Sequence, residues 1–388
     1  MNDWRIPGYT STGSKRPEAV FGPAADPALP RQIVRAAGAR VWDAAGREYL
    51  DWVMALGAVG LGYGHPAVQA AAARAIAAGV TGPLPPVEEE QLAEALARRI
   101  PWMERTRFLK SGAEAVAAAV RLARVATGRE HVLGCGYHGW LDWCQGRSEG
   151  VPESTRRLFA ELPFNDVERA REMIRDRGDR LAAVVIEPVV VREPTREWLE
   201  TLRAETQRVG AVLVLDEIKT AFRLAPGGAA ERYGIAPDLV TIGKALANGF
   251  PLAAVGGRTD LMTGATRTWI SSTLATETVS LAAALATLEV YERDAVCAHL
   301  HRVGTRLWHG LHRLAREHPA VVIDVGGVAE MCFLNYANES LSYAVAAGCA
   351  KRGLLLKRTA YNFVSLAHAE ADVDWTLGIL EDVLRSLA

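Results

Sequence analysis

The chain has 388 residues, of which 49% are hydrophobic, and its 44 basic and 45 acidic side chains nearly cancel. This balance excludes a field of one sign that would steer the protein to nucleic acid or to an anionic membrane. The five cysteines form no CxxC pair and no metal-ligand spacing, and neither a signal peptide nor a bilayer-spanning run is evident. We therefore expect a cytoplasmic protein without a metal site, with two domains in one compact subunit.

The first hundred residues contain strand and helix patterns around a polar arm. Residues 1–30 are rich in Gly, Pro, Ser and Thr and predict an extended arm, and residues 31–52 predict two short strands. Residues 66–82 predict an alanine-rich helix that ends at a glycine. Residues 87–99 predict a second helix, because acidic side chains occupy its first turn and arginines its last, as the helix dipole favours.

Strand-like apolar runs then alternate with helical patterns. The runs are 106–109, 131–133, 182–186, 212–215, 239–242, 253–256 and 268–271. This alternation predicts an α/β fold with a mostly parallel seven-stranded sheet wrapped by helices. Residues 279–316 predict a long helical segment that leads into a smaller α+β domain, which we expect to be built from both termini. The expected division is 1–60 for the arm and part of the small domain, 61–285 for the large domain, and 286–388 for the C-terminal small domain.

A candidate phosphate site opens the helical pattern that follows the first of these runs. Ser111 and Glu114 have the spacing of a capping box, and Gly112 and Ala113 between them are small. A helix N-terminus of this kind presents backbone N–H groups and the positive end of the helix dipole to an anion. An ordinary capped helix gives the same pattern, so the motif alone does not decide between the two.

The next strand-like run is followed by a motif that has two interpretations. Residues 134–139 spell GxGxxG, which is also the pattern of a dinucleotide-binding turn. Here Trp140, Asp142 and Trp143 follow in place of the small apolar face of such a helix. An NAD-dependent oxidoreductase is therefore the weaker alternative.

Two further runs end in chemically informative residues. Asp216 ends one of them, and Lys244 ends the next, between small and apolar neighbours that lower a lysine pKa by desolvation. A lysine amine and a carboxylate are the groups that a pyridoxal-phosphate (PLP) enzyme needs to bind the cofactor aldehyde and to keep its pyridine nitrogen protonated. Lys110 also follows an apolar run, whereas Lys219, three residues after Asp216, is expected to point elsewhere. A lysine that extends from an α/β loop into solvent remains the alternative for Lys244.

Several motifs occur in one order along nearly the whole chain. They are residues 61–66 (LGYGHP), 111–115 (SGAEA), 136–139 (GYHG), 186–188 (IEP), 216–218 (DEI), 243–246 (GKAL), 249–251 (GFP) and Thr273. In this respect the chain resembles the class III aminotransferases of PLP fold type I, with the greatest likeness to the glutamate-1-semialdehyde aminomutase-like members. The usual hydroxyl residue is replaced by Ala113, and the usual Gly-Gly-Asn-Pro after Thr273 is replaced by residues 275–278 (ATET).

The resemblance implies a set of roles around PLP. Lys244 forms the Schiff base and moves the substrate proton, Asp216 pairs with the pyridine nitrogen, and Glu187 lines the O3′ side. Tyr137 stacks on one face of the ring with His138 nearby, and Ile218 lies on the other face. The phosphate is held by Ser111, Gly112 and Ala113 and by Thr273 of a partner subunit, which implies a homodimer.

Substrate choice is less determined by the sequence. The resemblance places Trp52, Met54 and Arg16 on the substrate side, and the altered loop places Glu277 near the entrance. We expect an aminotransferase that acts on an amino donor and on a ketone or aldehyde of a small, sugar-like or secondary metabolite. An intramolecular aminomutase or racemase is the first alternative, and a PLP-fold protein that binds without catalysis is another.

Overall fold

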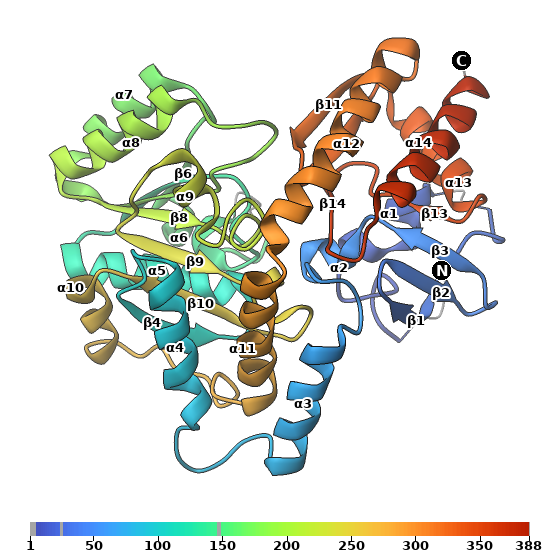
Figure 1. Ribbon diagram of the computed structural model, residues 1–388. Coiled ribbons are helices and arrows are strands. Elements are labelled where there is room, and N and C mark those ends of the chain that lie inside the picture. Colours follow the sequence, from blue (N-terminus) through green and yellow to red (C-terminus); the bar gives the residue numbers. More distant parts are fainter. Residues whose placement is uncertain (1–4, 24–25, 146–148, 388) are drawn as a thin grey trace. The chain divides into compact units, whose positions relative to one another are not determined.

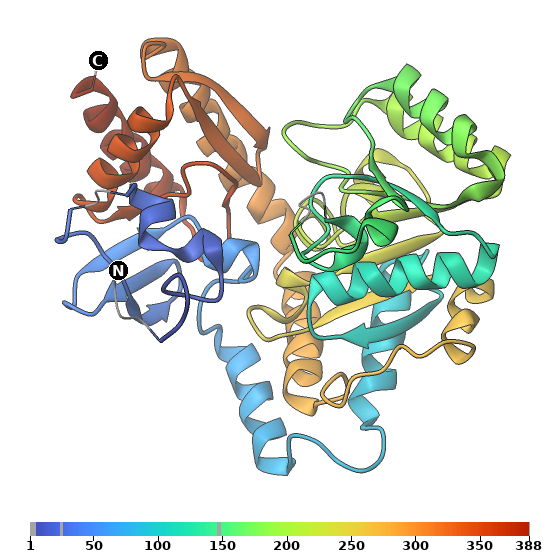
Figure 2. The same cartoon turned by 180° about the vertical axis from the view of Figure 1, so that it is seen from behind.

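The computed structural model describes residues 5–23, 26–145 and 149–387. The chain divides into two compact units, shown in Figures 1 and 2. Unit 1 consists of Met1–His65 and Ala298–Ala388, and unit 2 of Pro66–Cys297. These divisions lie 5 and 12 residues beyond those expected from the sequence, since 65 − 60 = 5 and 297 − 285 = 12.

A seven-stranded sheet forms the centre of unit 2, in the order β4-β10-β9-β8-β7-β5-β6. All of its strand pairs are parallel except the two that β10 makes with β4 and β9. The mostly parallel sheet predicted from the sequence is therefore confirmed. In sheet order the strands are Arg105–Leu109, Ala253–Gly257, Leu239–Ile242, Val212–Asp216, Leu181–Ile186, His131–Cys135 and Phe159–Glu161.

The central strands are continuous apolar runs because helices cover both faces of the sheet. Along β8, Val212 and Val214 pack into the cluster that contains helix α5 (Gly112–Thr127). Leu213 and Leu215 point to the opposite face, into the cluster that contains α7 (Val167–Arg177) and α8 (Arg196–Val209). Figures 1 and 2 show α7 and α8 side by side over that face.

The strand predicted at 268–271 is wrong. This stretch has no regular structure, because arginine side chains take up its backbone carbonyls: Arg107 donates to Ile270 O and Arg121 to Trp269 O. The seventh strand is instead β6, a three-residue edge strand with half-buried side chains. Such a short edge strand carries almost no periodic signal in the sequence.

The helices predicted at 66–82 and 87–99 are observed as α3 (Pro66–Ala78) and α4 (Val87–Arg99). Unit 2 also contains α6 (Glu153–Arg156), α9 (Gly228–Tyr233), α10 (Thr259–Met262) and α11 (Thr278–Arg293). The predicted helical segment 279–316 is two helices, α11 and α12 (Val296–Glu317). They are separated at Ala295, whose φ of 46° is left-handed and cannot continue a helix.

Unit 1 combines both ends of the chain, as expected. Strand β13 (Leu354–Leu355) pairs in parallel with β3 (Glu48–Asp51), at one edge of a sheet completed by β2 (Arg40–Asp43) and β1 (Ile33–Ala37). The three strands of residues 33–51 replace the two predicted there. A second sheet and the remaining helices are β11 (Val322–Val328), β12 (Met331–Tyr336), β14 (Asn362–Phe363), α1 (Pro17–Phe21), α2 (Met54–Gly57), α13 (Glu339–Ala350) and α14 (Glu370–Arg385).

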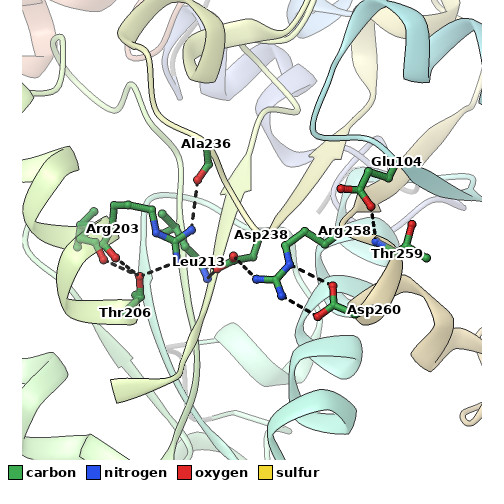
Figure 3. Close-up of polar contacts among 10 residues, drawn as sticks. Glu104, Arg203, Thr206, Leu213, Ala236, Asp238, Arg258, Thr259 and Asp260 are labelled. Carbon is green, nitrogen blue, oxygen red and sulfur yellow. Dashed lines mark hydrogen bonds and ion pairs between the residues drawn. The ribbon is translucent and has the colours of Figure 1, made fainter. Parts of the chain in front are cut away.

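Asp238 organises the amino-terminal edge of the parallel strands (Figure 3). It precedes β9, and its carboxylate accepts hydrogen bonds from the backbone N–H of Leu213 at 2.8 Å and from Arg203 at 2.9 Å. Arg258, which follows β10, lies 3.1 Å from the other oxygen and also pairs with Asp260. Strands β8, β9 and β10 and helix α8 are thereby tied to one buried carboxylate.

Candidate active site

The carboxyl ends of the parallel strands bring the predicted residues of unit 2 to one edge of the sheet. Tyr137 and His138 follow β5, Glu187 follows β7, Asp216 ends β8 and Lys244 follows β9. These strands are neighbours in the sheet, so their C-terminal residues converge. In open α/β sheets this edge is where ligands bind.

Asp216 is buried and held in place by three donors. One carboxylate oxygen lies 2.8 Å from Nδ1 of His138, which must donate because a carboxylate only accepts. The other oxygen accepts from the backbone N–H of Ile218 at 3.2 Å and from the hydroxyl of Thr241 at 3.3 Å. The Nε2 atom of His138 is buried and has no partner among the residues that the structure describes. The site thus contains a fixed negative charge next to an unsatisfied polar atom.

Lys244 stands at a strained point of the backbone, with a φ of 44°. Burial, and to a smaller extent the positive charge of Lys219, lower the pKa of its amine from 10.5 to about 8. Glu187 and Asp216 act in the opposite direction, but their effect is smaller. A larger fraction of neutral amine is therefore present near neutral pH than in an ordinary lysine, and the neutral form is the one that attacks a carbonyl.

Lys219 lies in this site, contrary to the expectation that it points elsewhere. Its Nζ atom is 2.8 Å from Glu187, and both side chains are largely buried. The other oxygen of Glu187 accepts from the backbone N–H of Tyr137 at 2.9 Å. The turn that follows Asp216 returns the chain to the same edge within three residues, which a sequence pattern does not reveal. Lys219 therefore joins the loop after β8 to Glu187 after β7, and Glu187 in turn contacts the loop after β5.

The N-terminus of α5 forms a cradle in which small residues are required. Ser111 and Glu114 make the predicted capping box. A Cβ atom at Gly112 would lie 3.1 Å from Ile218, and one at Gly139 would lie 2.4 Å from the Cβ of Ala113. The backbone N–H of Glu114 donates to Ser111 in this capping box. Those of Gly112 and Ala113 have no acceptor within the helix, so they are available to an anion.

These features fit PLP group by group. The amine of Lys244 suits its aldehyde, the carboxylate of Asp216 suits its pyridine nitrogen, and the N-terminus of α5 suits its phosphate. The ring of Tyr137 is 70% exposed and free to stack on an aromatic ligand. Ile218, which contacts the α5 cradle, also lies against Gly243, next to Lys244. Individual contacts to the cofactor for these residues remain predictions.

Glu277 has a structural position that the sequence did not suggest. It is the N-cap of α11 and accepts from the backbone N–H groups of Val279 and Ser280. Lys110 donates to the same carboxylate at 2.7 Å, and both side chains are mostly buried. A substrate that used this carboxylate would have to replace these contacts. Thr273 is exposed in the loop before α11, where a role toward a partner subunit stays a prediction.

The three other predicted substrate residues belong to unit 1. Trp52 is fully buried, stacks on His368 with ring centroids 4.0 Å apart, and donates to Thr376 at 2.8 Å. Met54 is also fully buried, and Arg16 is exposed at the start of α1. Packing alone explains the burial of Trp52 and Met54, and the predicted substrate roles of all three remain untested.

The described residues contain neither a metal-site cluster nor a helix able to span a membrane. Within 5–23, 26–145 and 149–387, no cluster of His, Cys, Asp and Glu has the arrangement of a metal site. Over the same residues, none of the helices combines the length and the apolar character needed to cross a membrane.

Comparison with known proteins identifies the family. The model of the aminotransferase class-III family matches residues 21–384. Glutamate-1-semialdehyde 2,1-aminomutase of Thermus thermophilus is 36% identical, over 98% of this chain and 96% of its own length.

Solved structures agree with the sequence comparison. The PLP internal aldimine form of FumI from Sphingopyxis sp. MTA144 superposes with a TM-score of 0.88 at 30% identity, covering 93% of this chain and 90% of its own. A β-phenylalanine aminotransferase from Variovorax paradoxus gives 0.88 at 27% identity, over 98% and 91%. PLP is accordingly the cofactor of this enzyme. The chain belongs to the class III aminotransferases, enzymes of PLP fold type I.

Proposed function

We propose that this enzyme transfers an amino group between an amino donor and a ketone or aldehyde of a small metabolite. The observation that carries the proposal is the convergence of Lys244, Asp216 and Glu187 at one edge of the sheet, with the α5 cradle beside Ile218. A lysine that is partly neutral, a buried carboxylate and an anion site are together what amino-group transfer on PLP requires.

Each residue has a defined task in this proposal. Bound PLP supplies an electron-withdrawing ring that stabilises negative charge on the carbon next to the amino nitrogen. Lys244, with its pKa near 8, would take up a proton from that carbon and return it to the carbon on the other side of the nitrogen. Asp216 keeps its partner pyridine nitrogen protonated, and His138 fixes the orientation of the Asp216 carboxylate. Glu187, which accepts from the backbone N–H of Tyr137, would line the O3′ side of the cofactor. The ring of Tyr137 would stack on one face of the pyridine ring.

An intramolecular aminomutase is the second candidate. It is favoured by curated relatives at 34–36% identity that are named glutamate-1-semialdehyde 2,1-aminomutase, including one from Neisseria gonorrhoeae that covers 99% of this chain. The aminotransferase proposal is supported by solved structures described as transaminases or aminotransferases, at 26–27% identity. A mutase uses the amino group of its own substrate, whereas a transaminase needs a separate donor and acceptor.

The visible spectrum of the purified protein tests both candidates. We expect a PLP absorption band that an amine donor bleaches and that a carbonyl acceptor restores. Lys244→Ala should lose this response, while Lys351→Ala, which changes an exposed lysine, should keep it. Restoration of the band by one substrate without any acceptor would favour the mutase. A protein that takes up no PLP would overturn the enzymatic proposal.

We also propose that the active form is a homodimer in which Thr273 contacts the cofactor phosphate of the partner subunit. The exposure of Thr273 and the resemblance of its motif support this. Thr273→Ala should bind PLP more weakly without changing the mass of the assembly, as measured by equilibrium dialysis and analytical ultracentrifugation. A monomeric active enzyme would contradict the proposal.

A further inference from the structure

Unit 1 contains a cavity of about 420 Å³. Its wall consists of the N-terminal segment around Tyr9–Phe21, parts of the β1–β3 sheet, the turn 53–56 and residues 355–357. Most of this wall is apolar, with contributions from Phe21, Val53 and Leu56. The cavity has the size and the apolar lining with a few polar groups that are typical of small-molecule sites.

Lys357 supplies a buried positive charge to this wall. It is only 6% exposed, and its Nζ atom donates to the carbonyl oxygen of Ser14 at 2.5 Å. Among the described residues, no carboxylate lies within ion-pair distance of this amine, whereas the better exposed Lys110, Lys219 and Lys351 each have one. A buried ammonium without a counter-ion is costly, and an anion placed beside it would be stabilised.

The two neighbouring arginines are already engaged. Arg358, next in the chain, donates to Ala19 O, Ser342 and Tyr343 and lies 3.5 Å from Glu339. Arg31, also on the cavity wall, pairs with Glu18 at 3.1 Å. Burial and the charge of Arg358 lower the pKa of Lys357. This lowering shows that the surroundings of Lys357 disfavour its positive charge as they stand.

Asp51 is the carboxylate of the cavity wall, and it does not neutralise Lys357. It accepts from the hydroxyl of Tyr63 at 2.8 Å and from the backbone N–H groups of Val53 and Met54 at 2.8 and 3.1 Å. Burial raises the pKa of this carboxyl group, which weakens its negative charge. Its hydrogen bonds hold the adjoining turn instead.

That turn is the segment labelled α2, whose backbone departs from that of a regular α-helix. It is strained where it lines the cavity. Met54, Ala55 and Leu56 have φ values of 47°, 50° and 60°, three consecutive left-handed residues of which none is glycine. Such a conformation is unfavourable for residues other than glycine and is concentrated at ligand sites. Because Ala55 and Leu56 face the cavity, the strained turn shapes its apolar wall.

We propose that this cavity binds a small carboxylic acid, with its carboxylate on Lys357 and its apolar body against Phe21, Val53 and Leu56. The ligand has one of two sources, which share this chemistry. It is either the carboxylate end of a substrate, an assignment that rests on the proposed function, or a separate acidic effector.

Calorimetric titration of the PLP-loaded protein with hexanoate tests the binding, with the neutral hexanamide as a matched control. We expect hexanoate to bind and hexanamide to bind more weakly by about ten- to hundredfold, the range for a hydrogen bond to a charged group. Lys357→Met should reduce hexanoate binding by a similar factor, whereas Lys357→Arg and the surface variant Lys351→Met should retain it. Equal affinity for the acid and the amide, or hexanoate binding that Lys357→Met leaves unchanged, would overturn the proposal.

Stability and kinetics complete the test. Replacing an uncompensated buried ammonium with methionine should not lower the melting temperature, so the loss of binding is separable from misfolding. Hexanoate that competes with a carbonyl acceptor identifies a substrate site, and noncompetitive inhibition identifies an effector site. Because binding is measured without turnover, failure of this proposal is distinguishable from failure of the proposed function.

Discussion

Asp216 and Asp238 are buried aspartates at opposite ends of two neighbouring strands, and their surroundings differ in kind. Asp238 has two arginines and a backbone N–H group as partners (Figure 3). Asp216 has a backbone N–H group, a hydroxyl and a histidine whose other nitrogen is unsatisfied. One edge of the sheet is therefore electrostatically complete, and the other is left with capacity for a ligand.

The two edges of this sheet therefore differ in role: the Asp238 edge contributes to stability, and the Asp216 edge carries the groups that can react. A buried charge whose partners are all present fixes the elements around it. At the other edge, Lys244 has a lowered pKa, and Asp216 has a histidine partner whose second nitrogen is unsatisfied. Groups in such an environment are candidates for binding or reacting with a ligand. Substitutions at the two edges should accordingly have opposite consequences.

The largest effect is expected from Asp216→Asn. The substitution keeps the shape of the side chain but removes the fixed negative charge that faces the cofactor nitrogen. We expect the rate at which an amine donor bleaches the PLP band to fall by about 10²–10³-fold, as when one preorganised electrostatic contact is lost. The free energy of unfolding should change little. A variant with the wild-type bleaching rate would show that Asp216 does not act on the cofactor.

Asp238→Asn is the matched change at the other edge. It leaves Arg203 without its buried counter-charge and weakens the contact to the partly exposed Arg258. We expect a loss of about 2–3 kcal/mol in the free energy of unfolding, measured by urea denaturation, because charged hydrogen bonds are broken. The bleaching rate per folded molecule should stay at the wild-type value. A selective loss of activity would contradict the division between the two edges.

Lys219→Met sharpens the comparison by changing the charge around Lys244. Removing the positive charge of Lys219 should raise the pKa of Lys244 above its value near 8, because one of the effects that lower this pKa is lost while Glu187 and Asp216 still raise it. We expect an about three- to tenfold smaller fraction of neutral amine at neutral pH. The rate at which cofactor-free protein captures PLP, measured against pH, should show the shift. Lys219→Arg keeps the charge and should leave the profile in place.

The same pKa has a consequence for stability. In the folded cofactor-free protein Lys244 loses its proton near pH 8, whereas in the unfolded chain it does so near 10.5. Between these values the unfolded chain binds more protons, so the stability of the folded state rises with pH across this window. Below pH 8 the full penalty for the charged amine is present. Lys219→Met should narrow this pH range by raising the lower pKa. Lys244→Met should abolish the increase in the free energy of unfolding that Lys244 contributes across it.

The residues at strand ends were predictable because apolar runs mark the strands and their last residues mark the edge. Asp216, Glu187 and Lys244 were found in this way. Lys219 was not, because its position depends on the path of a turn and not on any periodicity. The edge strand β6 was missed since three half-buried residues carry no alternation. The ion pair of Glu277 was missed because its partner, Lys110, lies 167 residues away in the sequence.

Glu277→Ala gives the smallest effect and places a third carboxylate in the comparison. Like Asp238, Glu277 has its oxygens engaged by a cation and by backbone N–H groups. Lys110 lowers the pKa of Glu277 against the opposing effect of burial, so the carboxylate is kept charged. We therefore expect a loss of about 1 kcal/mol in unfolding free energy, typical of a removed helix cap. The relative bleaching rates of different amine donors should not change; if they did, Glu277 would belong with Asp216, among the carboxylates that meet a ligand.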